Sequence, residues 1–176
     1  LYLSKLTSDF TVPISALEKS YLKALLNDAR IGLFLTPSQT ASLGSILAET
    51  PPLWKPEQFY YYDRFVDGDP YQDENYRRIF RTLLGAQKNR QYVNIDYTSP
   101  QGKRVHHYYV PARLEYSVKN DKFRLLALEG RHPQKMKLVV LNISRMQNVT
   151  ATDQTLTAAV DLNQIIRDSY EKEPLR

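Results

Sequence analysis

The feature that most constrains the fold is a change in the spacing of apolar residues near residue 91. Before this point apolar residues recur at helical spacing, whereas Val93, Ile95 and Tyr97 alternate with polar neighbours. A period of two is typical of a strand with one buried face. We therefore expect a helical N-terminal and linker segment over 1–90, a β-rich part over 91–150, and a linker with a C-terminal helix over 151–176.

The predicted helices begin at residues that can accept hydrogen bonds from the first turn. Ser15 with Glu18 forms a capping box, Thr36 with Gln39 forms a second one, and Pro37 suits the first turn. Asp73 can cap a third, basic helix. The spacing predicts helices over 15–28, 37–48 and 73–89, and one that begins at Asp161.

The β-rich part divides into five short strands separated by turn residues. We predict them at 91–98, 103–110, 112–118, 122–129 and 135–144, with Pro111 ending the second. Five short strands cannot make a large sandwich, and closing them into a small barrel removes the exposed edges. The expected fold class is α+β, with a barrel core that contains Val93, Ile95, Leu125 and Leu141.

The positive charge is concentrated in the middle of the chain. Residues 76–149 hold fifteen Lys and Arg against four Asp and Glu, a net charge of +11, whereas residues 1–75 carry −4 and residues 150–176 carry −2. Such a concentration attracts anions such as phosphates, although an ordinary solvated surface is also compatible with it. The absence of cysteine excludes a disulfide scaffold and fits the cytoplasm. The first residue is Leu1, so we expect a fragment of a longer protein.

Catalytic and metal sites are not indicated. The adjacent His106 and His107 point to opposite faces of a predicted strand and cannot both bind one metal ion. No nucleophile elbow, phosphate loop or HExxH pattern is present. The helix over 37–48 has no Lys or Arg, which argues against a DNA-reading helix-turn-helix. We expect a protein that is not an enzyme and has no cofactor.

Two arginines are aligned with apolar strand faces. Arg124 shares a face with Leu126 and Leu128, and Arg145 falls at the end of the predicted fifth strand. An arginine in such a position either extends past the rim or has an anionic partner. Pairing with Glu115 or Glu129 and binding of a phosphate both remain open.

The order of these motifs resembles the WYL-domain family of bacterial transcriptional regulators, in a branch often seen in Gram-positive bacteria. The residues that carry the resemblance are the helical lead-in with 67–71, then Val93–Tyr97, Tyr108–Tyr116, Lys122–Ala127 and Leu141–Met146. The Trp-Tyr-Leu motif falls on Phe123–Leu125, the Pro-x-x-Leu motif on Pro111–Leu114, and the closing Arg-Ile on Arg145 and Met146. Trp and Tyr are replaced in the first of these, and a further arginine of the family falls on Asn142.

The resemblance implies an Sm/SH3-like barrel in a ligand-sensing regulatory module without its N-terminal winged helix. The implied ligand is single-stranded nucleic acid or a nucleotide-like anion, bound by Arg113, Arg124 and Arg145 with Tyr116 nearby. DNA contact would belong to a domain outside this chain. The alternative is a dimerisation or protein-interaction module without a small ligand, and we expect a homodimer because the first two helices carry more apolar surface than a small barrel covers.

Overall fold

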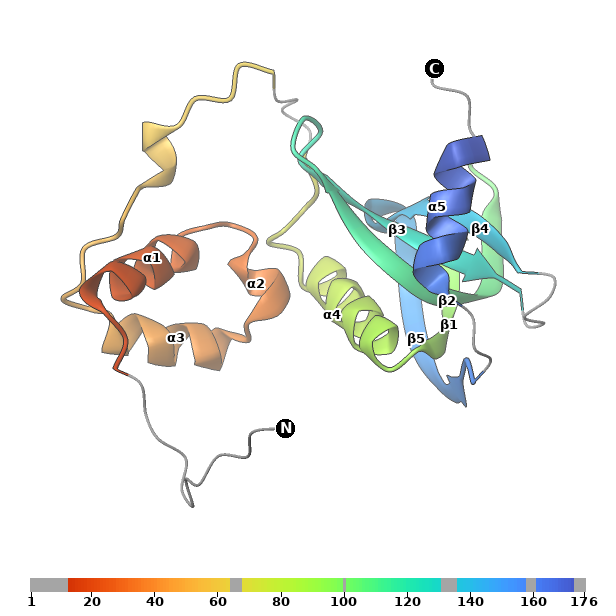
Figure 1. Ribbon diagram of the computed structural model, residues 1–176, viewed down its shortest axis with the longest axis horizontal. Helices are drawn as coiled ribbons and strands as arrows, with labels where there is room; N and C mark the ends of the chain where they lie inside the picture. The colour runs from red at the N-terminus through yellow and green to blue at the C-terminus, as the bar shows by residue number, and fades with distance from the viewer. Residues whose placement is uncertain (1–12, 64–67, 100, 131–135, 158–160, 173–176) are drawn as a thin grey trace, which may run out of the picture. The chain divides into compact units, whose positions relative to one another are not determined.

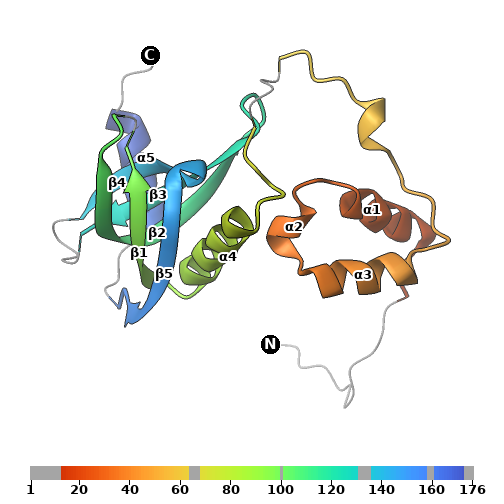
Figure 2. The same cartoon turned by 180° about the vertical axis from the view of Figure 1, so that it is seen from behind.

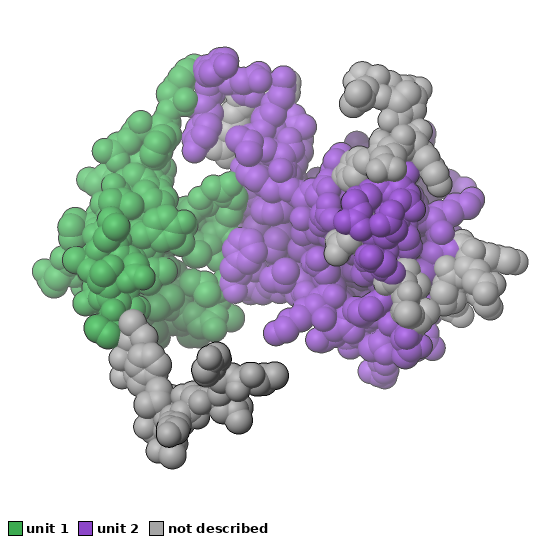
Figure 3. Space-filling model, viewed as in Figure 1, with its two compact units in different colours: residues 1–31, 35–60 green, residues 32–34, 61–176 purple. Residues whose placement is uncertain are grey.

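The chain forms two compact units in a computed structural model that describes residues 13–63, 68–99, 101–130, 136–157 and 161–172. The first unit comprises residues 1–31 and 35–60, and the second comprises 32–34 and 61–176 (Figure 3). In these described residues, no helix is long and apolar enough to cross a membrane.

The first unit is helical and follows the predicted caps. It contains α1 (Ala16–Leu26), α3 (Pro37–Ile46) and a 3-10 turn at Pro56–Gln58. Between α1 and α3 in sequence comes the short α2 (Ile31–Phe34), of which residues 32–34 belong to the second unit. Ser15 and Thr36 each form a complete capping box, as predicted. The backbone and hydroxyl hydrogen bonds from Ser15 lower the pKa of Glu18. After α1, Asp28 accepts hydrogen bonds from the backbone and the guanidinium of Arg30.

The second unit is a five-stranded antiparallel sheet with α4 (Glu74–Lys88) and α5 (Leu162–Lys172) (Figure 1). Its strands, in the spatial order β4-β3-β2-β1-β5, are β1 (Gln91–Thr98), β2 (Arg104–Ser117), β3 (Lys122–Glu129), β4 (Lys137–Asn142) and β5 (Met146–Thr155). A 3-10 turn, Ile143–Arg145, joins β4 to β5. The predicted α+β class is confirmed. No hydrogen-bonded pairing between β4 and β5 closes the sheet in the described residues, so the closed barrel stays a prediction.

Two strand predictions are wrong. The residues predicted as separate strands at 103–110 and 112–118 form the single strand β2, because Pro111 does not end it. The pairing with β1 stops at Tyr109, so no bond from the nitrogen of Pro111 is needed on that side. On the β3 side, the register shifts between Pro111 and Arg113. The fifth strand of the sheet is β5, which the sequence analysis missed, and Lys135 lies outside the described residues.

The two helices of the second unit pack on opposite faces of the sheet (Figures 1 and 2). The larger core joins α4 through Ile79, Phe80 and Leu83 to one face, and it includes the predicted core residues Val93, Ile95, Leu125 and Leu141. The smaller core joins α5 to the other face through Val110 and Leu128.

Helix α4 also covers acceptors of the strand β5. Asn75 Nδ2 donates to the carbonyl of Gln147 at 3.2 Å, and Arg78 donates to the carbonyl of Val149 at 3.4 Å. Because β5 is an edge strand, these side chains satisfy carbonyls that a neighbouring strand would otherwise bond.

Candidate functional site

A pocket of about 670 Å³ lies at the turn end of the β2–β3 hairpin. Its lining is mainly polar and consists of Glu115, Tyr116, Ser117, Asn120, Lys122, Phe123, Arg124 and Asn142. Two of the four predicted site residues, Tyr116 and Arg124, therefore line this pocket, along with five polar residues that were not among the predicted site residues.

Strand register places the charged lining residues on one face of the sheet. Glu115 is paired with Arg124, Ser117 with Lys122, and Arg124 with Asn142. Residues opposite each other in an antiparallel pair share a face, and residues two apart along a strand share it as well. Lys122, Arg124 and Asn142 thus stand on the same face, which offers two cations and an amide to a ligand.

Arg124 forms an ion pair with Glu115. Its Nε donates to Glu115 Oε2 at 2.9 Å, and its terminal Nη2 lies 2.8 Å from the same oxygen. The pairing with Glu115 weighed in the sequence analysis is confirmed. The Arg124 side chain is 47% exposed, so solvent screens this pair and the guanidinium stays accessible to a further anion.

Tyr116 lies on the opposite face from Arg124. Its ring centroid is 4.9 Å from that of Phe123, and its hydroxyl donates to Asp121 Oδ1 at 2.7 Å. The ring of Phe123 in turn contacts Phe80 of α4 at 5.0 Å. Tyr116 therefore supports the hairpin from its core side, while it also lines the pocket.

The other two predicted arginines do not line the pocket. Arg113 is paired with Leu126, which puts it on the face of Arg124 but further along the hairpin. The sequence had suggested that Arg145 ends a strand. Arg145 instead lies in the 3-10 turn after β4. The position of β5 explains this difference, because the turn connects β4 to a strand that sequence analysis did not find.

The missed residue with the clearest sequence signal is Lys122. It precedes Arg124 by two positions in a strand that was correctly predicted, so the alternation already puts both cations on one face. Asn142 could not be found in this way, because its position beside Arg124 depends on the register between β3 and β4.

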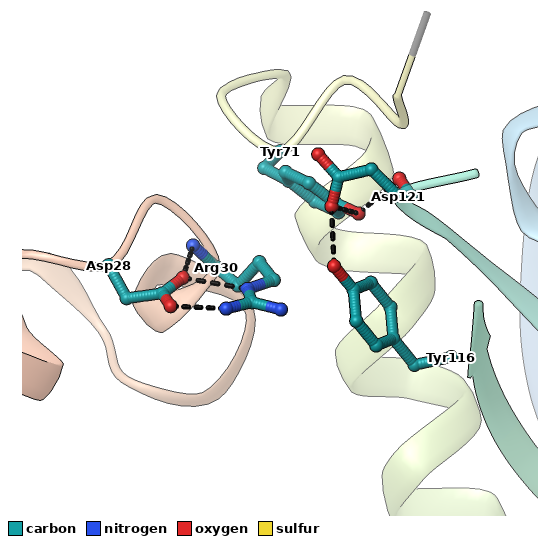
Figure 4. Close-up of polar contacts among 5 residues, drawn as sticks. All are labelled: Asp28, Arg30, Tyr71, Tyr116 and Asp121. Atoms are coloured by element: carbon teal, nitrogen blue, oxygen red, sulfur yellow. Dashed lines mark hydrogen bonds and ion pairs between the residues drawn. The ribbon is translucent and has the colours of Figure 1, made fainter. Parts of the chain in front are cut away.

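The turn of the hairpin is held by two buried carboxylates, Asp69 and Asp121, each 7% exposed. Tyr71 donates to Asp121 Oδ1 at 3.0 Å and Tyr116 donates to the same oxygen (Figure 4). Asp69 Oδ2 accepts from the hydroxyl of Tyr76 and from the amide of Phe123, both at 2.6 Å. Burial and the bond to Asp69 raise the pKa of Tyr76 well above its usual range, so this hydroxyl stays a donor.

A second pocket, of about 330 Å³, lies over β1 and β2. Its lining includes Asp96 and His106, and His106 Nδ1 lies 2.5 Å from Asp96 Oδ1. His107 instead lies 3.8 Å from Glu129, consistent with the predicted opposite faces. The described residues contain no group of three or more His, Cys, Asp or Glu that could hold a metal ion.

Neither a family model nor a curated protein matches the sequence. Among solved structures, the chain is similar to the Proteasome accessory factor B/C (PafBC) of Arthrobacter aurescens, at 17% identity and a TM-score of 0.42. The match covers 84% of this chain and 22% of that chain.

Proposed function

We propose that this chain is a non-catalytic, ligand-sensing module of a bacterial transcriptional regulator. It binds single-stranded nucleic acid or a nucleotide-like anion in the pocket at the turn end of the β2–β3 hairpin. The observation that carries the proposal is the placement of Lys122 and Arg124 on one strand face, beside Asn142. The motif order that resembles the WYL-domain family supports the regulatory role, and with it an Sm/SH3-like arrangement of the five strands.

The lining chemistry fits a phosphate-containing ligand. A guanidinium can donate two parallel hydrogen bonds to a phosphate, and the ammonium of Lys122 adds a point charge. Asn120, Asn142 and Ser117 supply neutral donors and acceptors for the rest of the ligand. The carboxylate of Glu115 neutralises one positive charge in the pocket. We therefore expect a modest affinity for the phosphate-containing ligand, which falls as the salt concentration rises.

The test is a titration of a fluorescein-labelled oligodeoxythymidylate of about twelve nucleotides, followed by anisotropy. Lys122→Ala and Arg124→Ala should each weaken binding about tenfold, since a hydrogen bond to a charged group contributes about 1.5 kcal/mol or more. Each should also lower the salt slope by about one unit. Lys103→Ala, which removes an exposed lysine outside the pocket, is the matched control.

Two further variants separate this pocket from the site expected from sequence alone. Arg113→Ala and Arg145→Ala should weaken binding less than Arg124→Ala, because neither residue lines the pocket. Unchanged affinity in both Lys122→Ala and Arg124→Ala, with the fold intact, would contradict the proposed site. A larger loss for Arg145→Ala would move the site to the turn after β4.

An interaction module without a small ligand is the second candidate. The first unit leaves large apolar side chains in solvent, with Leu17 65% and Ile46 75% exposed. Such side chains are suited to burial against a second copy, as in the homodimer expected from the sequence. Association through them should change little with salt, whereas phosphate binding weakens steeply.

A further inference from the structure

Two parts of the second unit that are far apart in sequence are joined by a cluster of two carboxylates and three tyrosines: Asp69, Asp121, Tyr71, Tyr76 and Tyr116. On one side is the segment 68–73, which leads into α4, and on the other is the turn between β2 and β3. The backbone amide of Asp69 donates to the carbonyl of Asp121 at 3.0 Å. The hydroxyl of Tyr71 donates a hydrogen bond to the same carbonyl at 2.5 Å. The two parts are thus connected by backbone and side-chain bonds at once.

The turn has little freedom within this cluster. Asp121 has a φ of 50°, in the left-handed region that few residues other than glycine, Asn and Asp adopt readily. A Cβ on Gly68 would lie 2.8 Å from Asp121 Oδ2 and 3.1 Å from its Cβ. The segment and the turn are therefore in direct contact, and neither can shift by much unless the other moves.

The same turn carries the pocket. Asn120 and Lys122 flank Asp121 in sequence, and both line the pocket. Phe123 also lines it, and its backbone amide donates to Asp69 Oδ2. A ligand that contacts this lining acts on residues whose neighbours are bonded to the segment 68–73.

We propose that Asp69 and Asp121 are positioning residues that couple occupancy of the pocket to the order of the segment 68–73. Ligand binding holds the turn, the turn holds Asp69 and Tyr71, and the entrance of α4 becomes more ordered. The coupling is reciprocal: the factor by which the ligand favours the ordered segment is also the factor by which ordering of the segment raises the affinity for the ligand. This inference rests on the proposed function for its ligand, but the connection itself exists without ligand.

The connection is tested first by hydrogen exchange in the 176-residue chain without ligand. Tyr116→Phe keeps the ring and removes one bond to Asp121, and it should speed exchange of the Asp69 and Tyr71 amides about fivefold. Tyr76→Phe should, from the other side, speed exchange of the Phe123 amide. Tyr109→Phe, a buried tyrosine of β2 outside the cluster, should leave all three amides unchanged. If Tyr116→Phe leaves Asp69 and Tyr71 at wild-type rates, the connection is refuted.

The response to ligand is tested with the same oligodeoxythymidylate. Binding should slow exchange at Asp69 and Tyr71 in the wild type, although neither lines the pocket. Tyr71→Phe, which removes the hydroxyl bonds to Asp121 at a residue that does not line the pocket, should lose most of this response while its affinity stays within about fivefold. Binding that leaves these amides unaffected overturns the coupling. If no oligonucleotide binds, the proposed function and the response to ligand fail together, whereas the free-chain experiment still decides whether the two parts are connected.

Discussion

The buried tyrosine Tyr109 of the second unit makes the stability of the fold depend on pH. Burial, with the charge and hydrogen bond of Glu129, raises the pKa of Tyr109 to about 12. In the unfolded chain a tyrosine ionises near pH 10. The folded protein therefore retains this proton where the unfolded chain loses it, and the resulting contribution to stability is complete only below about pH 10.

Stability should consequently fall between about pH 10 and pH 12, and Tyr109→Phe should reduce that fall. We expect the wild type to lose about 2 kcal/mol more than the variant across this interval. Urea unfolding of both proteins at several pH values measures the difference. Parallel stability curves would show that Tyr109 ionises at the same pH in the folded and unfolded chains.

Individual residues were predictable from sequence where their partners are close along the chain. The caps Ser15, Thr36 and Asp73 each bond an amide three residues ahead, so the pattern is visible in any four-residue window. Asp69 bonds the amide of Phe123, 54 residues away, and nothing local marks that contact.

At the scale of elements, the strands were predictable where one face is buried and polar residues alternate. β1 and β3 match their predicted ranges, whereas the sequence of β5 is polar along most of its length. Its position follows from pairing with β1, for which sequence periodicity gives no signal. The pocket was half predicted for the same reason: Arg124 follows from alternation, and Asn142 requires the register of β4.

Two glycines give an element-scale test of backbone conformation. A Cβ on Gly85, in α4, or on Gly102, in the turn after β1, would meet nothing within 4 Å. Gly85→Ala should stabilise the protein by about 0.5–1 kcal/mol, because alanine favours a helix. Gly102→Ala should destabilise it by about 1 kcal/mol, because Gly102 has a φ of 79°.

The free energy of unfolding of each variant and of the wild type is measured by urea titration, and thermal unfolding gives an independent comparison. Since the space around each site is equally open, a stability change of the same sign in both would contradict an origin in backbone conformation.

At the scale of the whole molecule, a short stretch near the N-terminus completes the core of the second unit. Leu33 is fully buried in the larger core, and the ring of Phe34 contacts that of Phe80 at 5.4 Å. Arg81 of α4 donates to the carbonyl of Gly32. The second unit is thus built from two separate parts of the sequence.

Leu33→Ala should destabilise the second unit by about 3 kcal/mol, as expected for a large-to-small change at a buried site. Hydrogen exchange of the β1 amides reports on that unit, whereas fluorescence of Trp54, the only tryptophan, reports on the first. The control is Leu47→Ala, at a buried site of the first unit, which should show the opposite pattern. A Trp54 transition that shifts as much as the β1 amides in Leu33→Ala would mean that the units unfold together.

The contacts from α4 to β5 bear on how the protein avoids aggregation. Asn75 and Arg78 occupy the carbonyls of Gln147 and Val149, which another chain would otherwise use to add a strand. If α4 detaches before the sheet unfolds, these acceptors become a template for intermolecular pairing. The order in which this helix and this strand come apart therefore decides whether partial unfolding is reversible or leads to a cross-β assembly.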